Sequence, residues 1–259
     1  MRVAGRSPRT LETYAEATSQ LRGFLEKAGH SLVVADIKRS DLEDFLLSLG
    51  ERWSPATVSN RFRALQSLFG FVVAVGELDR SPLGGLTPPR VPEKAIPVLT
   101  FEDVCSLLAT ASGTGFDPRR DSAIVRMLFD TGMRRAELCG LTCHDIDMEL
   151  AVASVMGKGR RPRSCPFGDQ TATAPARYLR VRAKHAHAGV DALWLGRNGS
   201  LSTSGVAQML RRRGRQAGVE VHPHMFRHAF ASAYLSDGGQ ESDLMRLAGW
   251  RSSTMAARS

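Results

Sequence analysis

The stretch SPLGGLTPPRVPEKAIP, residues 81–97, divides this chain in two. It is dense in proline and glycine, and it carries neither the 3.6-residue hydrophobic period of a helix nor the two-residue period of a strand. Such a segment is typical of a linker between folded domains. We therefore expect a first domain over residues 1–80, a linker over residues 81–98 and a second domain over residues 99–259.

On the amino-terminal side of this linker, apolar residues recur at helical spacing. Residues 10–28 carry one such stripe, and a shorter stripe follows it. Ser54 followed by Pro55 then gives a serine cap with proline in the first turn, which is a strong helix start. We expect a small all-helical bundle, with Arg61 and Arg63 on the basic polar face of its last helix.

On the carboxyl-terminal side, helical patterns surround one short extended region. Thr100, with Asp103 three residues later, opens the first helical pattern. ELAVASVM and RPRSCPF, within residues 145–167, are short extended runs separated by the GKG of residues 157–159, which is typical of a β-hairpin. The expected fold class is therefore mostly α with a small antiparallel β-sheet: an N-terminal helical bundle followed by an α+β domain.

The charge of the chain indicates a polyanionic partner. Its 259 residues include 35 Lys and Arg against 26 Asp and Glu, which gives a net charge of +9. No apolar run approaches the roughly 18 residues of a membrane span, so nucleic acid is favoured over a membrane. The amino terminus lacks the apolar core of a secretion signal, and we expect a cytoplasmic protein.

The cysteines are too few and too scattered to predict a disulfide framework. Cys139, Cys143 and His144 lie close together in the sequence, but their spacing matches no standard zinc site. We expect no metal ion and no other cofactor.

Two arginines stand in contexts that suit phosphodiester chemistry. Attack on a phosphodiester adds negative charge to its oxygens, so an enzyme that uses no metal must supply fixed cations and hydrogen-bond donors. Arginine suits this task because its fork is planar, permanently charged and bidentate. Arg134 follows the TGM of residues 131–133, and Arg227 lies three residues after His224. Either arginine alone would be read as a charged side chain in solvent. The two arginines in this order, with Lys158 between them, are a more specific indication of a phosphate site.

Four motifs follow one another along the second half of the chain: TGMRRAEL at residues 131–138, GKG at 157–159, HPHMFRHAF at 222–230 and LAGW at 247–250. Four motifs in a fixed order are a more specific signal than any one of them alone. Together they resemble the motifs of the tyrosine recombinases of the phage integrase family, including the Xer-like members. The first segment is similar to the family's SAM-like core-binding domain, so the resemblance covers nearly the whole chain. It implies a site-specific recombinase or integrase that cleaves and rejoins duplex DNA through a 3′-phosphotyrosyl intermediate, as a homotetramer on two paired sites.

The resemblance implies a role for each motif residue. Arg134 and Arg227 would hold the non-bridging oxygens of the scissile phosphate, and His224 would hydrogen-bond to it. Lys158, at the hairpin, would be the general acid that protonates the leaving 5′ oxygen. Trp250, at a position that is more commonly histidine, would donate a hydrogen bond from its indole nitrogen.

Residues around these motifs are expected to support the site or to bind DNA. Glu137 would buttress the site, and His228 is expected to be structural. Two arginine clusters could grip DNA phosphates and make the affinity salt-dependent, with a solvated charged face as the alternative for each. These clusters are Arg160, Arg161 and Arg163 beside the hairpin lysine, and Arg211, Arg212, Arg213 and Arg215 on a helical segment.

The family nucleophile is a tyrosine, and this chain has serine at its expected place. In the family this tyrosine lies nine residues beyond the Trp250 position and 35 beyond the His224 position, and both counts reach Ser259. A phenol, with a reference pKa of about 10, ionises far more readily than an aliphatic alcohol, so serine is a poor substitute. We expect the chain to bind DNA and hold the phosphate but to fail at cleavage, and to lack the family's C-terminal tail.

Three explanations of Ser259 stay open: the tyrosine and its tail were removed or replaced, the chain is a degenerate relative, or another protomer supplies a tyrosine. The third is disfavoured because Tyr14, Tyr178 and Tyr234 stand in no matching context and are expected on helices. A catalytically inactive DNA-binding remnant or regulator is the alternative function. A type IB topoisomerase shares the chemistry, but the N-terminal bundle and the short hairpin favour an integrase.

Overall fold

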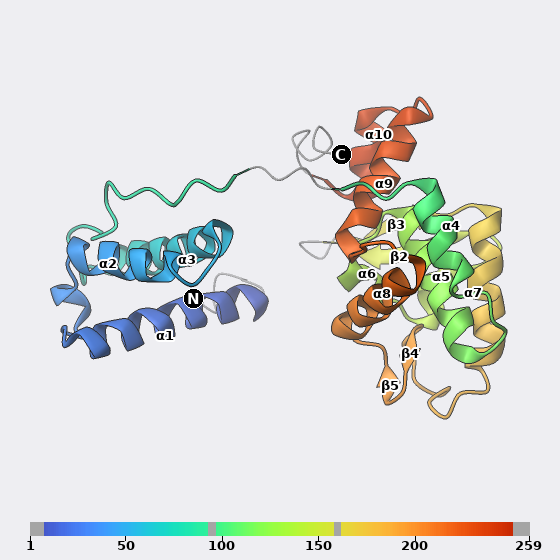
Figure 1. Cartoon of the computed structure of the whole chain (residues 1–259), viewed down its shortest axis with the longest axis horizontal. Helices are drawn as coiled ribbons and strands as arrows, with labels where there is room; N and C mark the ends of the chain where they lie inside the picture. Colours follow the sequence, from blue (N-terminus) through green and yellow to red (C-terminus); the bar gives the residue numbers. More distant parts are fainter. Residues whose placement is uncertain (1–7, 93–96, 158–161, 251–259) are drawn as a thin grey trace. The chain divides into compact units, whose positions relative to one another are not determined.

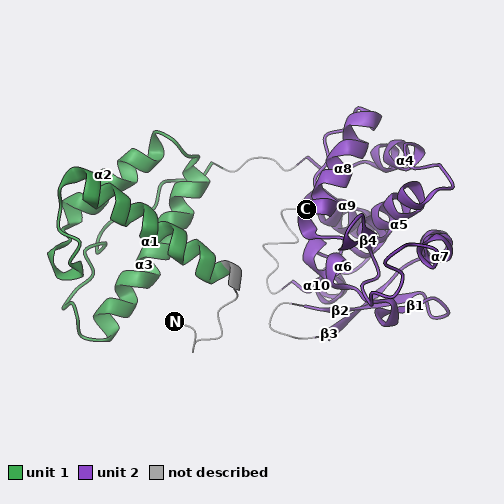
Figure 2. Ribbon diagram, turned by 90° about the horizontal axis from the view of Figure 1, so that it is seen from below, with its two compact units in different colours: residues 1–95 green, residues 96–259 purple. Residues whose placement is uncertain are grey.

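The computed structural model describes residues 8–92, 97–157 and 162–250. The chain divides into two compact units, residues 1–95 and 96–259 (Figure 2). The first unit is helical, and the second combines helices with two small antiparallel sheets (Figure 1). The expected fold class, mostly α with a small antiparallel sheet, is confirmed. None of the described helices is long and apolar enough to cross a membrane.

The described residues of the first unit form three α-helices: α1 (Pro8–Ala28), α2 (Arg39–Gly50) and α3 (Pro55–Ala74). A short 3-10 turn (Val34–Asp36) follows α1. The Ser54 hydroxyl accepts a hydrogen bond from the Thr57 backbone N–H at 3.4 Å, and Pro55 occupies the first turn, so α3 begins as expected. Phe45 and Phe62 are buried in the single core that the three helices share.

The proline-rich segment also contributes to the first unit. Leu83 is buried in the core of the three helices, and Leu86 packs against it. The Ser81 hydroxyl accepts from the Leu83 backbone N–H at 3.2 Å, which holds this leucine in a turn. The start of the segment expected as linker is therefore part of the packed first unit, although it lacks a helical or strand period.

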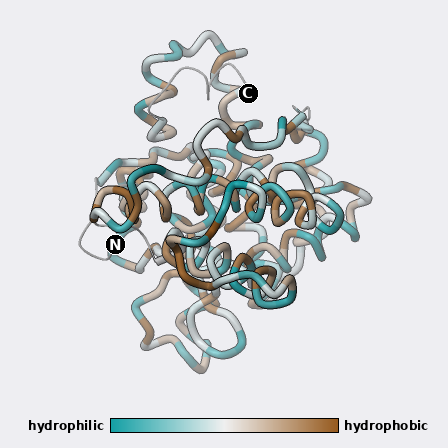
Figure 3. Tube along the Cα trace, turned by 90° about the vertical axis from the view of Figure 1, so that its left-hand side faces the viewer, coloured by the Kyte–Doolittle hydropathy of each residue, from teal (hydrophilic) through white to brown (hydrophobic). Residues whose placement is uncertain are grey.

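The second unit is built around α5, which packs against α7 and α9. Figure 3 shows hydrophobic and hydrophilic stretches interspersed along the chain. In chain order its elements are α4 (Phe101–Ala109), α5 (Phe116–Thr131), α6 (Arg135–Gly140), a 3-10 turn (Cys143–Asp145), β1 (Ile146–Asp147), β2 (Val152–Met156), β3 (Pro162–Pro166), α7 (Asp169–Arg182), β4 (Leu195–Gly196), β5 (Gly199–Ser200), α8 (Thr203–Ala217), α9 (Pro223–Ser236) and α10 (Glu241–Ala248).

The expected hairpin is confirmed as the pair β2 and β3. These strands are antiparallel, with Ala153 opposite Cys165, and β1 adds a third strand on the other side of β2. Both of these opposed residues are buried in the core of the second unit. One face of the sheet thus packs against the helices, and β3 contacts α10.

Candidate active site

Close packing of α9 against Gly132, where there is no room for a side chain, places Arg227 at the end of α5. Gly132 ends α5 with a φ of 55°, and a Cβ added there would lie 2.4 Å from the Phe230 ring. This close approach of α9 lets Arg227 Nη1 donate to the Gly132 carbonyl at 2.7 Å. Arg227 is only 3% exposed. Burial, followed by the charges of Arg134 and Arg163, lowers the pKa of its guanidinium to about 9, so it is still charged at neutral pH.

Glu137 joins two arginines at the start of α6. Its Oε2 accepts from the Arg134 backbone N–H at 2.7 Å, and its Oε1 accepts from Arg134 Nη1 at 2.8 Å. The same carboxylate pairs with Arg163 Nη2 at 2.7 Å. Burial raises the pKa of Glu137, but the hydrogen bonds from Arg134 and the charges of Arg163 and Arg134 outweigh burial and lower it. An ionised carboxylate therefore orients both arginines.

The carboxyl end of α10 is where three arginines meet. Gly249 ends this helix with a φ of 63°, and the Trp250 backbone N–H donates back to the Met245 carbonyl at 2.9 Å, as in a Schellman motif. The carbonyls that remain accept from three guanidinium groups: Leu247 from Arg163, Ala248 from Arg227, and Gly249 from Arg134 at 3.2 Å. The negative end of a helix thus offsets part of their charge.

Trp250 covers the buried arginine of this cluster. The Arg227 guanidinium carbon lies 5.2 Å from the centroid of the Trp250 ring, which is a cation–π contact. The indole Nε1 is buried, and among the described residues it has no hydrogen-bond partner. An unpaired buried donor costs roughly 1–3 kcal/mol, so this N–H is suited to an acceptor such as a phosphate oxygen.

Two histidines lie one turn apart on α9. His224 is exposed and His228 is buried, and their rings meet edge to face with centroids 4.8 Å apart. Partial burial, together with the charges of Arg227, His222 and Arg134, lowers the pKa of His224 below 6.5. Burial and the neighbouring His224 lower the pKa of His228 in the same way. Both rings are thus neutral at pH 7, and a neutral imidazole can donate one hydrogen bond and accept another.

The structure therefore brings together residues that the sequence separates widely: Arg134, Glu137, His224, Arg227, His228 and Trp250. Their roles in catalysis remain predictions. Four other predicted site residues lie outside the described part of the chain: Lys158, Arg160, Arg161 and Ser259.

Three arginines that we predicted to bind DNA are instead held inside the fold. The exposed side-chain fractions of Arg61, Arg163 and Arg213 are 14%, 12% and 9%. Arg61 Nη2 pairs with Glu16 at 2.7 Å, and Arg213 Nη2 pairs with the fully buried Asp121 at 2.8 Å. These three side chains are therefore not free at the surface, because each one pairs with a carboxylate within its own unit. Their contact with DNA stays a prediction.

The remaining predicted DNA-binding arginines reach the surface. Arg212 pairs with Asp121 at 2.9 Å while half of its side chain stays exposed. Arg63, Arg211 and Arg215 are exposed. The polar face of α8 is therefore basic, but only part of the arginine run belongs to it.

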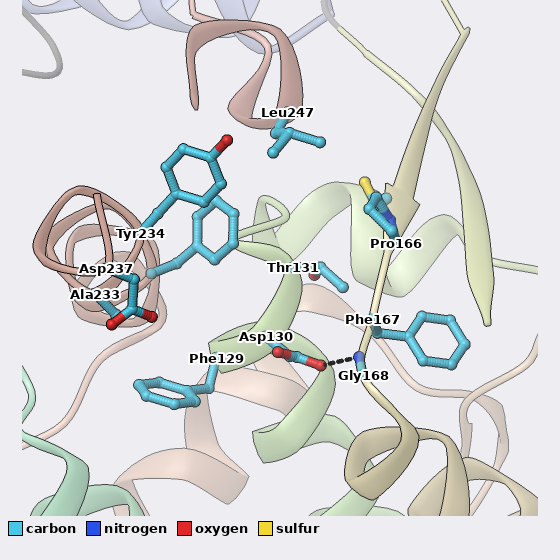
Figure 4. A pocket seen from close by; sticks show the side chains of 12 residues that line it. Phe129, Asp130, Thr131, Pro166, Phe167, Gly168, Ala233, Tyr234, Asp237 and Leu247 are labelled. Atoms are coloured by element: carbon cyan, nitrogen blue, oxygen red, sulfur yellow. Dashed lines mark hydrogen bonds between the residues drawn. The ribbon is translucent and has the colours of Figure 1, made fainter. Parts of the chain in front are cut away.

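A cavity of about 410 Å³ adjoins the arginine cluster, with Cys165 and Leu247 in its wall (Figure 4). Most of this wall is apolar, and its charged groups are Asp130 and Asp237. Carboxylates repel phosphate, so this cavity does not suit the scissile group. Tyr234 lines the cavity from α9. Like Tyr14 and Tyr178, it lies on a helix as expected.

The thiols do not indicate a metal centre. In the described ranges, no group of three or more His, Cys, Asp or Glu side chains is placed to hold a metal ion. Burial raises the pKa of both Cys139 and Cys165 to about 11, so neither is a thiolate at neutral pH.

Known proteins match both units. Residues 97–258 match the phage integrase family, and residues 1–74 match the phage integrase N-terminal SAM-like domain. The chain is 31% identical over 246 residues to tyrosine recombinase XerC of Pseudomonas aeruginosa strain LESB58, covering 94% of this chain and 80% of the relative. It is 32% identical over 238 residues to tyrosine recombinase XerA of Thermococcus kodakarensis, covering 91% and 78%.

Solved structures agree with this assignment. The crystal structure of XerA recombinase has 26% identity and a TM-score of 0.58, covering all of this chain and 88% of that one. A lambda integrase (75–356) dimer bound to a COC′ core site has a TM-score of 0.77 at 17% identity, covering 98% and 89%, and so shares the fold. The chain therefore belongs to the phage integrase family, whose tyrosine recombinases cleave and rejoin DNA.

Proposed function

We propose that this protein is a cytoplasmic site-specific recombinase or integrase that binds duplex DNA as a homotetramer on two paired sites, without a metal or other cofactor. The observation that carries this proposal is the convergence of Arg134, Arg227 and Trp250 at the carboxyl end of α10. Structural neighbours support the choice of partner, because they include XerH bound to its difH substrate and a lambda integrase tetramer bound to a Holliday junction.

The scissile phosphate would displace carbonyl oxygens from the two catalytic arginines. Arg134 is the more accessible of them, with 36% of its side chain exposed, and it would meet the phosphate first. A phosphate oxygen is negatively charged and two of them match an arginine fork, so phosphate competes well with the neutral carbonyls of Ala248 and Gly249. Glu137 would keep the Arg134 fork oriented during this exchange.

The same groups would favour the transition state over the bound substrate. Attack on phosphorus places more negative charge on the non-bridging oxygens, where the two arginines, neutral His224 and the Trp250 N–H can donate. As the bond from phosphorus to the 5′ oxygen breaks, Lys158 would protonate that oxygen. An intact relative would use a tyrosine hydroxyl for the attack and hold the 3′ phosphate covalently.

Ser259 determines whether this chain can carry out the cleavage step. A serine hydroxyl is a weak nucleophile without an adjacent base, and its alkoxide leaves less readily than a phenolate. The chain with Ser259 would therefore bind DNA and hold the phosphate without cleaving it. Ser259 equally favours a second candidate function, that of an inactive DNA-binding remnant or regulator at recombination sites. A Ser259→Tyr variant separates the two, because only a chain with an intact site regains covalent attachment.

Selection of binding sites from a random duplex library tests the proposed partner. We expect one sequence to be enriched, and we expect Arg134→Gln and Arg227→Gln each to weaken binding to it by about tenfold or more, since a hydrogen bond to a charged group contributes roughly 1.5–3 kcal/mol. Enrichment of no sequence, or unchanged affinity in both variants, would contradict specific DNA recognition through this site.

A further inference from the structure

A second arginine cluster lies in a pocket between α4, α5 and α7, helices that lie side by side in Figure 1. The cavity measures about 310 Å³. Its charged residues come from two facing helices: Arg119 and Arg126 from α5, and Arg177 from α7. Residues 119, 122 and 126 on one helix, and 170, 173 and 177 on the other, share the i, i+3, i+7 spacing that places side chains on one face.

These arginines differ from their neighbours in having no partner. Within the residues described, no ion pair or hydrogen bond involves the guanidinium of Arg119, Arg126 or Arg177. Arg120, the next residue on α5, is buried and pairs with Asp117 at 2.8 Å and with Asp121 at 2.7 Å. In the described ranges, carboxylates thus pair with the structural Arg120, and none pairs with the three arginines that line this pocket.

A multiply charged anion suits such a pocket. The three arginines line one recess, in which Arg177 itself is exposed to solvent, and a bound anion would supply the counter-charge for all three. Ser112, Ser122 and Gln170 also line the recess and supply neutral donors. The charged residues of the pocket are all arginines, unlike the cavity beside the active site, which carries Asp130 and Asp237.

We propose that this pocket binds a small phosphorylated anion that carries two or more phosphate charges, such as an inorganic or nucleoside polyphosphate. Its volume is at the lower end of the roughly 300–1,000 Å³ of small-molecule sites. A concave recess of this size suits a compact ligand better than the continuous convex backbone of a duplex. Arginine forks match phosphate oxygens bidentately, which gives affinity for phosphate over simple anions.

Calorimetric titration of the full chain with inorganic tripolyphosphate tests this site. We expect saturable binding that Arg126→Gln and Arg177→Gln each weaken by about tenfold and that the double variant abolishes. Arg180→Gln is the matched control, because Arg180 is exposed on α7 and lies outside the pocket lining. Circular dichroism and thermal unfolding of each variant show whether the fold is retained.

Three results would overturn the proposal. The first is no saturable binding of tripolyphosphate by the parent chain. The second is loss of binding in Arg134→Gln with full binding in the Arg126→Gln/Arg177→Gln double variant, which would place the anion at the catalytic cluster. The third is a double variant that loses duplex DNA affinity as strongly as tripolyphosphate affinity, which would make the DNA backbone the source of phosphate.

Discussion

Arg134, Arg163 and Arg227 show how three guanidinium groups can stand together at neutral pH. Each donates to a different carbonyl at the end of α10, and Glu137 accepts from two of them. One carboxylate and one helix terminus offset part of the repulsion between the arginines. The three guanidinium groups are therefore gathered on folding, before a phosphate displaces the carbonyls that Arg134 and Arg227 bind.

Removing the charge of Glu137 should show how far the arginine cluster depends on this carboxylate. We expect Glu137→Gln to lower the free energy of unfolding by about 2–3 kcal/mol, because two partly buried arginines lose their counter-charge. Urea unfolding followed by circular dichroism measures the change. Glu149→Gln is the control, since Glu149 is exposed, and it should stay within about 0.5 kcal/mol of the parent. Equal stabilities of the two variants would show that Glu137 does not hold the cluster.

His224 should make DNA affinity depend on pH. Its pKa lies below 6.5 in the free protein, and a nearby phosphate raises the pKa of an imidazole, so DNA binding takes up a proton. Affinity should therefore rise as the pH falls below about 6.5, and this rise should be smaller in His224→Gln. Fluorescence anisotropy at constant salt measures both profiles. His144→Gln, altered at an exposed histidine, should keep the parent profile; a parental profile in His224→Gln would refute the assignment.

At the scale of elements, local signals in the sequence predicted where helices begin and end. Thr100 and Asp103 form the expected capping box of α4, with bonds of 3.1 and 2.9 Å. Ser54 caps α3, and Gly132 ends α5 in the left-handed conformation. These signals are predictable because each depends on the few residues that a helix end contains.

The helix and strand periods of the sequence indicate which arginines point into the fold. This pattern is hard to see where several arginines are adjacent. In β3, Arg163 lies two residues before Cys165 and so shares its inward face. In α8, Arg213 follows Val206 by seven residues and Met209 by four, which places it on the buried face. Adjacency in the sequence alone does not show this division between buried and exposed arginines.

The carbonyl partners of the cluster could not be predicted from the sequence. Contacts of the Gly132 and Gly249 carbonyls with Arg227 and Arg134 join residues about a hundred positions apart. Backbone carbonyls carry no residue-specific signal, and only the packing of α9 and α10 decides which of them face a guanidinium. The motif residues themselves were identified through family resemblance, because no single motif is specific alone.

Substitution of the helix-ending Gly132 should cost more stability than substitution of Gly218, which ends a helix in a similar way. Gly218 ends α8 with a φ of 69° and has open space around an added Cβ, whereas a Cβ at Gly132 meets the Phe230 ring at 2.4 Å. Gly218→Ala should cost about 1 kcal/mol for its backbone conformation. Gly132→Ala should cost at least about 2 kcal/mol more, because α9 must move away. Urea unfolding of both variants compares them, and equal losses would rule out the close approach of α9.

For the whole molecule, the arginines that remain exposed should set the salt dependence of DNA binding. Arg211 and Arg215 lie on the outer face of α8, whereas Arg213 pairs with Asp121. We expect Arg211→Gln and Arg215→Gln each to reduce the slope of log K against log salt by about 1 if each contacts a phosphate. Arg213→Gln should instead lower the unfolding temperature. Unchanged slopes in both surface variants would remove α8 from the DNA interface.

Covalent trapping tests the central proposal most directly, that this chain holds the scissile phosphate but does not attack it because serine stands at the tyrosine position. A nicked suicide substrate that carries the DNA sequence selected above would capture any protein joined to a 3′ phosphate, and denaturing electrophoresis would resolve the adduct. We predict no adduct for the chain with Ser259 and a clear adduct for Ser259→Tyr. Robust adduct formation by the Ser259 chain, or none by the tyrosine variant when it binds the same DNA, would contradict the account.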